Sequence, residues 1–167
     1  MTISFGDPFA TPEGQRSPVR RLRGRLPAPV TLWTAGTGAG LTVSSTLVAD
    51  GDPGRILGLV DDESDLWPEL SATGRFAVIP LGAADRQLAD RFAGVLPAPG
   101  GPFATGDWRS TEYGQVPADA GTWAGCRFDQ ARPCGWGLLV EGTIDHLEVG
   151  AADEPLAYFR GRYRELR

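Results

Sequence analysis

Alternating apolar and polar positions divide most of the chain into short strands. Runs rich in β-branched and aromatic residues recur between clusters of glycine, proline and aspartate, which are typical of turns. The pattern predicts strands over Val30–Thr34, Leu41–Val48, Arg55–Val60, Phe76–Leu81, Trp123–Phe128, Trp136–Val149 and Leu156–Phe159.

Helical spacing of apolar residues is rarer, and it first occurs in an arginine-rich segment. Within residues 16–25, Val19 and Leu22 fall at i and i+3, and Leu26 follows at i+7. The same segment carries five arginines, so it predicts a short amphipathic helix with a basic face. That face could be simply solvated, or it could attract an anionic ligand or partner.

Two further helices interrupt the strands. Ser64 is expected to cap a helix that runs to about Thr73, where Gly74 stops it. Another helix is expected over 83–93, ended by Gly94. Residues 95–121 form a long connection rich in glycine, proline and alanine, and such a connection in a compact domain is usually functional or covering.

Many strands and few short helices predict a mainly β Greek-key barrel. The length of 167 residues suggests one domain. Residues 1–15 are polar and contain proline and glycine, which predicts a flexible N-terminal arm before a folded domain at 16–167.

Charge and composition exclude several classes of protein. The net charge of −5 disfavours nucleic acid as a main partner. No apolar run is long enough to cross a membrane and no signal pattern opens the chain, so a cytoplasmic protein is expected. The two cysteines, Cys126 and Cys134, are too few for a disulfide framework or a zinc site and are expected to be reduced.

Missing residue types constrain the chemistry further. The chain contains no lysine, which rules out Schiff-base chemistry and a P-loop. His146 is the only histidine, so an imidazole metal cluster is not expected, and neither is a catalytic triad. We therefore expect no metal site and no catalytic side chain, and a cofactor would carry the chemistry of an enzyme.

The stretch WTAGTGAGLTVSST at 33–46 combines glycines with hydroxyls, as phosphate sites do. A dinucleotide fingerprint would need glycine where Leu41 stands, and a strand rather than a helix follows. The remaining interpretations are a hairpin turn and a ligand-binding segment, and the local sequence leaves both open.

The order of these segments resembles the flavin reductase-like, FMN-binding split-barrel family, which includes the reductase components of two-component flavin monooxygenases. The resemblance runs from about Val19 to Leu166. It is carried by GLTVSSTLVADGDPGRILGLV after the first strand, SATGRFAVIPLGAADRQLADRFAG, PFATGDWRSTEYG, TWAGCRFD and PLAYFRGRYREL.

The resemblance implies a bound FMN, with FAD as the alternative, and NADH or NADPH as co-substrate. It also implies a homodimer and a partner monooxygenase. By position, the flavin would contact Thr34, Thr42, Val43, Ser44, Ser45, Val60, Asp61, Ser64, Phe92, Ala93 and Gly94. The nicotinamide would lie beside Arg160, Gly161, Arg162 and Tyr163.

The chain departs from the family pattern at three places. Gly137 stands where members often carry a histidine that assists nicotinamide binding, and Trp136 precedes it. Ile79 replaces an asparagine, and the segment after the third strand, often basic, reads Asp61-Asp62-Glu63-Ser64-Asp65. An acidic segment beside a phosphate costs affinity unless an arginine from elsewhere offsets it.

Three functions therefore stay open from the sequence. The first is an NAD(P)H-dependent flavin reductase that supplies reduced flavin to a monooxygenase. The second is an FMN-binding or electron-transfer protein without efficient nicotinamide use, which Gly137 favours. The third is a split-barrel protein in a structural or interaction role, which the acidic segment favours.

Overall fold

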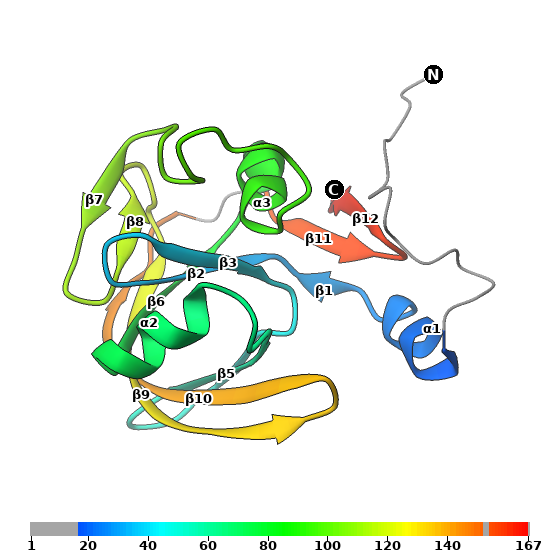
Figure 1. The fold of residues 1–167 in the computed structure, drawn as a ribbon, viewed down its shortest axis with the longest axis horizontal. Helices are drawn as coiled ribbons and strands as arrows, with labels where there is room; N and C mark the ends of the chain where they lie inside the picture. The colour runs from blue at the N-terminus through cyan, green and yellow to red at the C-terminus, as the bar shows by residue number, and fades with distance from the viewer. Residues whose placement is uncertain (1–16, 152–153, 167) are drawn as a thin grey trace.

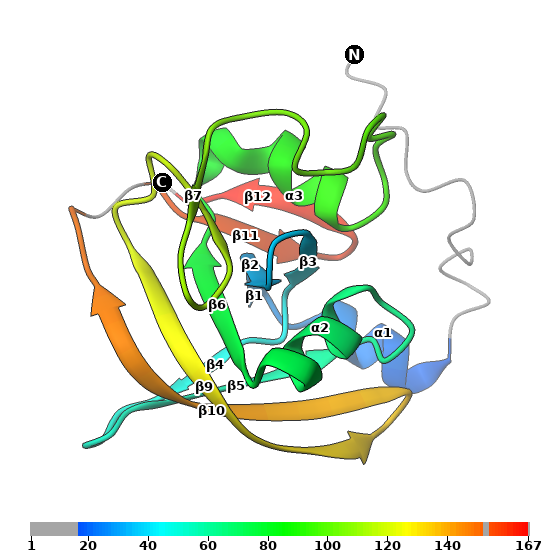
Figure 2. The same cartoon turned by 60° about the vertical axis from the view of Figure 1, so that its left-hand side comes forward.

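The computed structural model describes residues 17–151 and 154–166, so the arm predicted over 1–15 lies outside the described residues. Strands dominate the fold (Figures 1 and 2). The helices are α1 (Pro18–Gly24), α2 (Leu66–Thr73) and α3 (Arg86–Phe92), with a 3₁₀ turn η2 (Ala83–Asp85). The strands are β1 (Ala28–Pro29), β2 (Thr31–Ala35), β3 (Ala39–Val43), β4 (Leu47–Ala49), β5 (Arg55–Val60), β6 (Arg75–Pro80), β7 (Trp108–Ser110), β8 (Gln115–Pro117), β9 (Trp123–Cys134), β10 (Gly137–Glu148), β11 (Leu156–Phe159) and β12 (Arg162–Glu165).

Seven strands form one antiparallel sheet in the order β3-β2-β6-β9-β10-β5-β4. The two outermost strands, β3 and β4, are consecutive in the chain and only residues 44–46 separate them. Because so short a connection cannot span an open sheet, its two edges must meet. The sheet therefore curls into a barrel (Figure 2), which confirms the mainly β split-barrel fold with short helices.

The prediction of one strand over Leu41–Val48 is wrong, because the chain bends at Ser44–Thr46 and β3 and β4 flank the bend. The Ser45 hydroxyl accepts a hydrogen bond from the Leu59 N–H (2.9 Å) and donates to the Leu59 carbonyl (3.2 Å). Serine side chains compete in this way with the backbone ladder. The bend thereby gains a link to β5 that replaces regular strand pairing.

The barrel interior is built around two stacked aromatic rings. Trp33 and Phe76 are fully buried, with ring centroids 4.8 Å apart and planes 13° from parallel. The Trp33 indole N–H lies 3.2 Å from the Thr31 hydroxyl and 3.1 Å from the Thr46 hydroxyl. Leu66 and Leu70 of α2 complete this cluster, so α2 covers one end of the barrel.

A second apolar cluster lies outside the barrel wall. Successive side chains of a strand point to opposite faces, so Leu32 points outward where Trp33 points inward. Leu32 packs with Phe92 of α3 and Val116 of β8. The 95–121 connection, expected to be functional or covering, contributes Tyr113 and Val116 to this cluster. It also contains the β7–β8 hairpin, which the sequence did not predict.

Helix boundaries differ from the predictions in two ways. Asp65, not Ser64, precedes α2, because the Ser64 hydroxyl instead donates to the Asp61 carbonyl at 2.6 Å. The helix expected over 83–93 is divided into η2 and α3. The stop at Gly74 is confirmed, since Gly74 takes a left-handed conformation (φ 71°) and its N–H bonds the Leu70 carbonyl.

Strand boundaries are confirmed for β5 and β11, whereas β9 runs to Cys134, six residues beyond its predicted end at Phe128. β12 was not predicted, and with β1 and β11 it forms a separate three-stranded sheet. Among the described residues, no helix is both long and apolar enough to span a bilayer.

Both cysteines are unpaired, as expected, and Cys126 is buried on β9. Burial, with Asp145 and Asp129 nearby, raises the pKa of the Cys126 thiol to about 12. At pH 8 only about one thiol in ten thousand would then be the reactive thiolate. We expect Cys126 in a Cys134→Ser variant to react with a chromogenic disulfide only after denaturation; an immediate reaction of the folded variant would contradict its burial.

Candidate functional site

The connection between β3 and β4 lies where the residues expected at the flavin gather. Ser44 and Ser45 are half-buried in this connection, and Ser45 ties it to the end of β5. The turn at 61–65 follows β5 directly and leads into α2. The structure thus brings together Val43, Ser44, Ser45, Val60, Asp61 and Ser64, and their contact with a flavin stays a prediction.

A phosphate needs hydrogen-bond donors, so the destination of each hydroxyl proton decides which side chains can bind it. Thr34 donates to the Gln115 carbonyl and Thr42 to the Ala89 carbonyl, each at 2.6 Å. Ser45 and Ser64 donate to the carbonyls of Leu59 and Asp61. Four of the five hydroxyls expected at the flavin therefore already donate to carbonyl groups of the protein.

Ser44 differs from these four residues. Its side chain is half-buried, and over the described residues no hydrogen bond involves its hydroxyl. A partly desolvated hydroxyl without a partner can donate to an anion at no cost to the fold. Ser44 is therefore the hydroxyl best prepared to hold a phosphate.

The two valines of the set, Val43 and Val60, have buried side chains that belong to the barrel core. They could contact a ligand only through their backbone. Thr34 is likewise fully buried, so a ligand would reach its backbone at most. Their contribution to the site is to fix the positions of Ser44 and the 61–65 turn.

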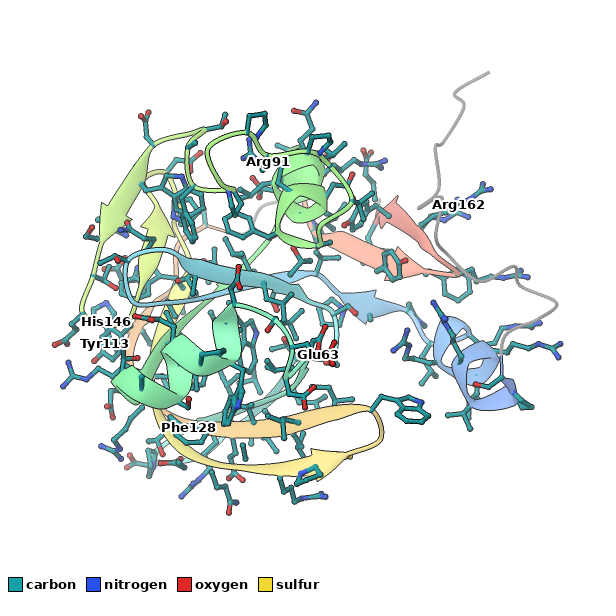
Figure 3. The ribbon with its side chains drawn as sticks, in the orientation of Figure 1. Glu63, Arg91, Tyr113, Phe128, His146 and Arg162 are labelled. Carbon is teal, nitrogen blue, oxygen red and sulfur yellow. The ribbon has the colours of Figure 1, made fainter. Side chains whose placement is uncertain are left out.

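The 61–65 turn is strongly acidic and exposed. Asp61, Asp62, Glu63 and Asp65 supply four carboxylates within five residues, and the Asp61 carboxylate accepts the Glu63 N–H at 2.9 Å. Figure 3 shows Glu63 at the beginning of α2, on the side of the barrel that faces α1. These charges would repel a phosphate held by Ser44 unless cations offset them.

Phe92, Ala93 and Gly94 lie at the end of α3, on the outer face of β3. The Thr42 hydroxyl ties β3 to this helix through the Ala89 carbonyl. Phe92 is buried edge-on to Phe103, with centroids 4.8 Å apart, and Gly40 lies beneath both rings. Ala93 and Gly94 are exposed, so they can meet a ligand or partner where Phe92 cannot.

The residues expected at the nicotinamide form the β11–β12 hairpin. Arg160 and Gly161 make its turn with positive φ angles of 54° and 77°. Tyr163 packs edge-on to Tyr158, and its pKa is raised by burial and by the nearby Asp90 carboxylate. The Arg160 N–H donates to the Gly24 carbonyl at 3.1 Å, which joins this turn to α1.

Gly137, the position at which the family resemblance leads us to expect a histidine, is tightly constrained. A Cβ there would lie 2.9 Å from the Val60 carbonyl oxygen, a backbone atom that cannot move aside easily. We expect Gly137→Ala to lower the free energy of unfolding by about 1–3 kcal/mol through overpacking. Gly38→Ala is the matched control, because no atom lies within 4 Å of a Cβ there, and an equal effect of both changes would contradict this account.

His146 lies on β10 at the other end of the strand from Gly137. Nine residues of strand span about 30 Å. Its ring lies 4.7 Å from that of Trp123, and Glu148 accepts the Trp123 indole N–H at 2.7 Å. Figure 3 places His146 and Tyr113 together, away from Glu63 and Arg162. His146 is thus a strand residue that belongs to an aromatic cluster, which the sequence did not predict.

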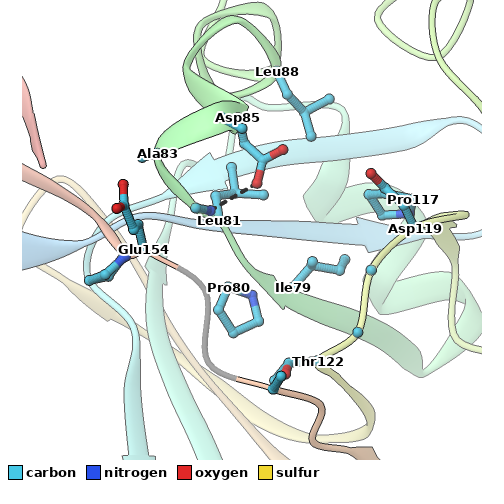
Figure 4. Close-up of a pocket in the computed structure, with 16 residues that line it drawn as sticks. Ile79, Pro80, Leu81, Ala83, Asp85, Leu88, Pro117, Asp119, Thr122 and Glu154 are labelled. Carbon is cyan, nitrogen blue, oxygen red and sulfur yellow. Dashed lines mark hydrogen bonds between the residues drawn. The ribbon is translucent and has the colours of Figure 1, made fainter.

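A cavity of about 520 Å³ lies between the end of β6, η2 and the 117–122 segment (Figure 4). Among the described residues that line it, the charged side chains are Asp85, Asp119 and Glu154, and none is basic. An anionic cofactor would be repelled there, and no residue expected at the flavin lines it. We therefore place the candidate site at the β3–β4 connection.

Comparison with known proteins identifies this architecture. The family sequence model of the flavin reductase-like domain matches residues 23–167. The chain is 29% identical over 160 residues to the FMN reductase (NADH) RutF of Agrobacterium fabrum, covering 93% of this chain and 91% of that protein. It is 27% identical over 127 residues to the reductase component of 4-hydroxyphenylacetate 3-monooxygenase of Thermus thermophilus, covering 76% and 78% of the two chains.

Solved structures agree with the sequence comparison. The NADH:FAD oxidoreductase of Streptomyces globisporus C-1027, in complex with NAD and FAD fragments, superposes with a TM-score of 0.81 at 25% identity. The superposition covers 95% of this chain and 96% of that one. Because the family model covers most of the sequence and the barrel agrees with it, the chain belongs to the flavin reductase-like domain family.

Proposed function

We propose that this protein is an NADH-dependent flavin reductase that supplies reduced flavin to a monooxygenase. The observation that carries the proposal is its likeness to an FMN reductase (NADH) over nine-tenths of both chains. The similarity to a monooxygenase reductase component supports the same role. We further propose FMN as the bound flavin, with FAD as the alternative, a homodimer, and a cytoplasmic location.

In this proposal the phosphate end of the flavin lies at the β3–β4 connection. Ser44 donates to the phosphate, and Ser45 holds the connection against β5 through Leu59. When bound, the flavin supplies the hydride acceptor, so the protein needs to orient it and the nicotinamide rather than provide an acid. This agrees with a site that contains no histidine.

The nicotinamide would approach from the β11–β12 turn. Arg160 and Arg162 are exposed there, and guanidinium groups suit the pyrophosphate of a dinucleotide. Figure 3 shows Arg162 on the same side of the barrel as Glu63. NADPH would add one more phosphate to this contact, so it is the alternative co-substrate.

The test is NADH oxidation by the purified protein with FMN, FAD or no added flavin, followed at 340 nm. We expect turnover only when flavin is present. A parallel melting curve with FMN at about 100 times its dissociation constant should show stabilisation of about 2.7 kcal/mol, roughly a 5–10 °C shift. NADPH in place of NADH gives the co-substrate preference.

The outcomes separate the alternatives. A melting shift without NADH oxidation would overturn the reductase and favour a flavin-binding or electron-transfer protein, which Gly137 in place of a histidine already suggests. The absence of any shift would favour a structural or interaction role.

A further inference from the structure

Helix α1 has little surface to pack on within the described part of the chain. None of its residues is buried, and Val19 and Leu22 are 75% and 64% exposed, with Leu26 just beyond it 61% exposed. An isolated helix shorter than about 12–15 residues is marginal in water. The Ser17 cap and the Arg160–Gly24 hydrogen bond hold only its ends. Its apolar face therefore needs a partner surface.

The charges of α1 are also unmatched. Arg20, Arg21, Arg23 and Arg25 are exposed, and within the described ranges none of them forms an ion pair. The acidic turn at 61–65 carries the opposite charge, and none of its four carboxylates has an ion-pair partner within the described ranges. One chain thus carries two unpaired surfaces of opposite charge.

Apolar residues flank the acidic turn. Leu59, two residues before it, is 41% exposed. Trp136 is fully exposed at the β9–β10 turn, and Leu138 two residues on pairs with Val60, so the tip of this hairpin lies beside the acidic turn. The turn and its neighbours therefore offer carboxylates for the arginines of α1 and apolar groups for its leucines.

Both surfaces lie on the same side of the molecule. Figure 2 shows α1 and the beginning of α2 toward the same side, and Figure 3 shows Glu63 on the side of the barrel nearer α1. A two-fold contact buries the same patch on both copies, so two complementary surfaces on one side can satisfy each other twice. A second copy of this chain is the partner that fits.

We propose that α1 of each copy docks on the acidic turn of the other copy and that its arginines complete the flavin phosphate site. The apolar face of α1 covers Leu59 and Trp136, and its guanidinium groups neutralise the carboxylates next to Ser44. The docking stands on the exposed surfaces alone. The role toward phosphate rests on the proposed function.

The energetics explain why α1 needs both kinds of contact. An exposed ion pair contributes about 0–1 kcal/mol, so arginines alone would hold the copies weakly. Every contact is made twice in a two-fold dimer, and apolar burial adds about 25 cal/mol per Å². The ionic part should weaken at 1 M salt, where the Debye length falls to about 3 Å.

A charge exchange tests the contact. Arg20→Glu/Arg21→Glu reverses α1, Asp62→Arg/Glu63→Arg reverses the turn, and a third variant carries all four changes. We expect each reversal to weaken the dimer at least about tenfold in sedimentation equilibrium. The variant with all four changes should recover most of that loss. A monomeric wild-type protein, or no recovery in the four-fold variant, would overturn the docking.

A second pair of variants tests the apolar part. Leu22→Asp should dissociate the dimer, whereas Leu147→Asp should not, although Leu147 is also exposed (57%) and lies at the far end of β10. Because both side chains are exposed in one chain, neither change should unfold it. Equal effects of the two changes on the dimer would contradict the contact.

FMN titration of the same variants, followed by flavin fluorescence, tests whether the arginines of α1 take part in the flavin phosphate site. At protein concentrations that keep the dimer intact, Arg20→Glu/Arg21→Glu should weaken FMN binding at least about tenfold. An unchanged dissociation constant would overturn the role of the arginines and leave the docking in place. If the wild-type protein binds no flavin, the proposed function fails, while the exchange experiment still decides the docking.

Discussion

Trp33→Ala is expected to lower the free energy of unfolding by about 3–5 kcal/mol, the largest stability effect of any change considered. The ring is fully buried and stacks on Phe76 at 4.8 Å. Its loss leaves a cavity inside the barrel and removes the indole N–H from the hydroxyls of Thr31 and Thr46. Urea denaturation followed by circular dichroism measures the change.

Trp33→Phe separates packing from hydrogen bonding. This variant keeps a ring against Phe76 but loses the N–H, and we expect it to cost about 1–2 kcal/mol. Leu147→Ala, on the exposed part of β10, should change stability by less than about 0.5 kcal/mol. A loss below about 1 kcal/mol in Trp33→Ala would contradict the central role of this ring.

A second variant should couple to Trp33. A Cβ at Gly58 would lie 2.6 Å from the Trp33 ring, so Gly58→Ala destabilises the wild-type protein by overpacking. In the Trp33→Ala background the same methyl group enters the cavity and its cost should fall or change sign. A double-mutant cycle measures this coupling, and additive effects would show that the two positions do not touch.

Ser44→Ala is expected to weaken FMN binding about tenfold or more without changing stability. A hydrogen bond to a charged group contributes about 1.5–3 kcal/mol, and tenfold in affinity is about 1.4 kcal/mol. The Ser44 hydroxyl has no protein partner in the described part of the chain, so its removal breaks nothing in the fold. Fluorescence titration with FMN and a melting curve without ligand measure the two quantities.

Ser45→Ala should instead act mainly on stability rather than on FMN binding. Its hydroxyl is bonded to both backbone groups of Leu59, so its removal opens the β4–β5 side of the barrel and lowers stability by about 1–2 kcal/mol. Ser71→Ala, on the exposed face of α2, is the control for loss of a serine. If Ser44→Ala left the FMN dissociation constant unchanged, the phosphate would not lie at this hydroxyl.

The sequence predicted the strands of the barrel because apolar alternation and turn residues mark them directly. Trp33 lies in one of these predicted strands, and its large aromatic ring is fully buried. The glycines at 36–40 were correctly read as a candidate hairpin turn, and Gly36 adopts the positive φ (58°) that such a turn requires.

The hydrogen-bond acceptors of the hydroxyl groups could not be predicted from the sequence. Thr34, Thr42 and Ser44 look alike along the chain, yet two of them bond carbonyls that lie 81 and 47 residues away. The break at Ser44–Thr46 was missed for the same reason, because the Ser45–Leu59 link is a tertiary contact. The β7–β8 hairpin was hidden in a segment whose glycines and prolines indicate loop.

The order in which the strands pair also determines when the barrel can close during synthesis on the ribosome. β5 has its main pairing partner in β10, with Gly58 opposite Val140, so about 80 residues must be added after β5 before it can pair with β10. At about 5–20 residues per second that is a wait of roughly 4–16 s. During this interval the apolar strands of the first half have no finished sheet to join, so the nascent chain should be a client for chaperones that bind exposed apolar segments.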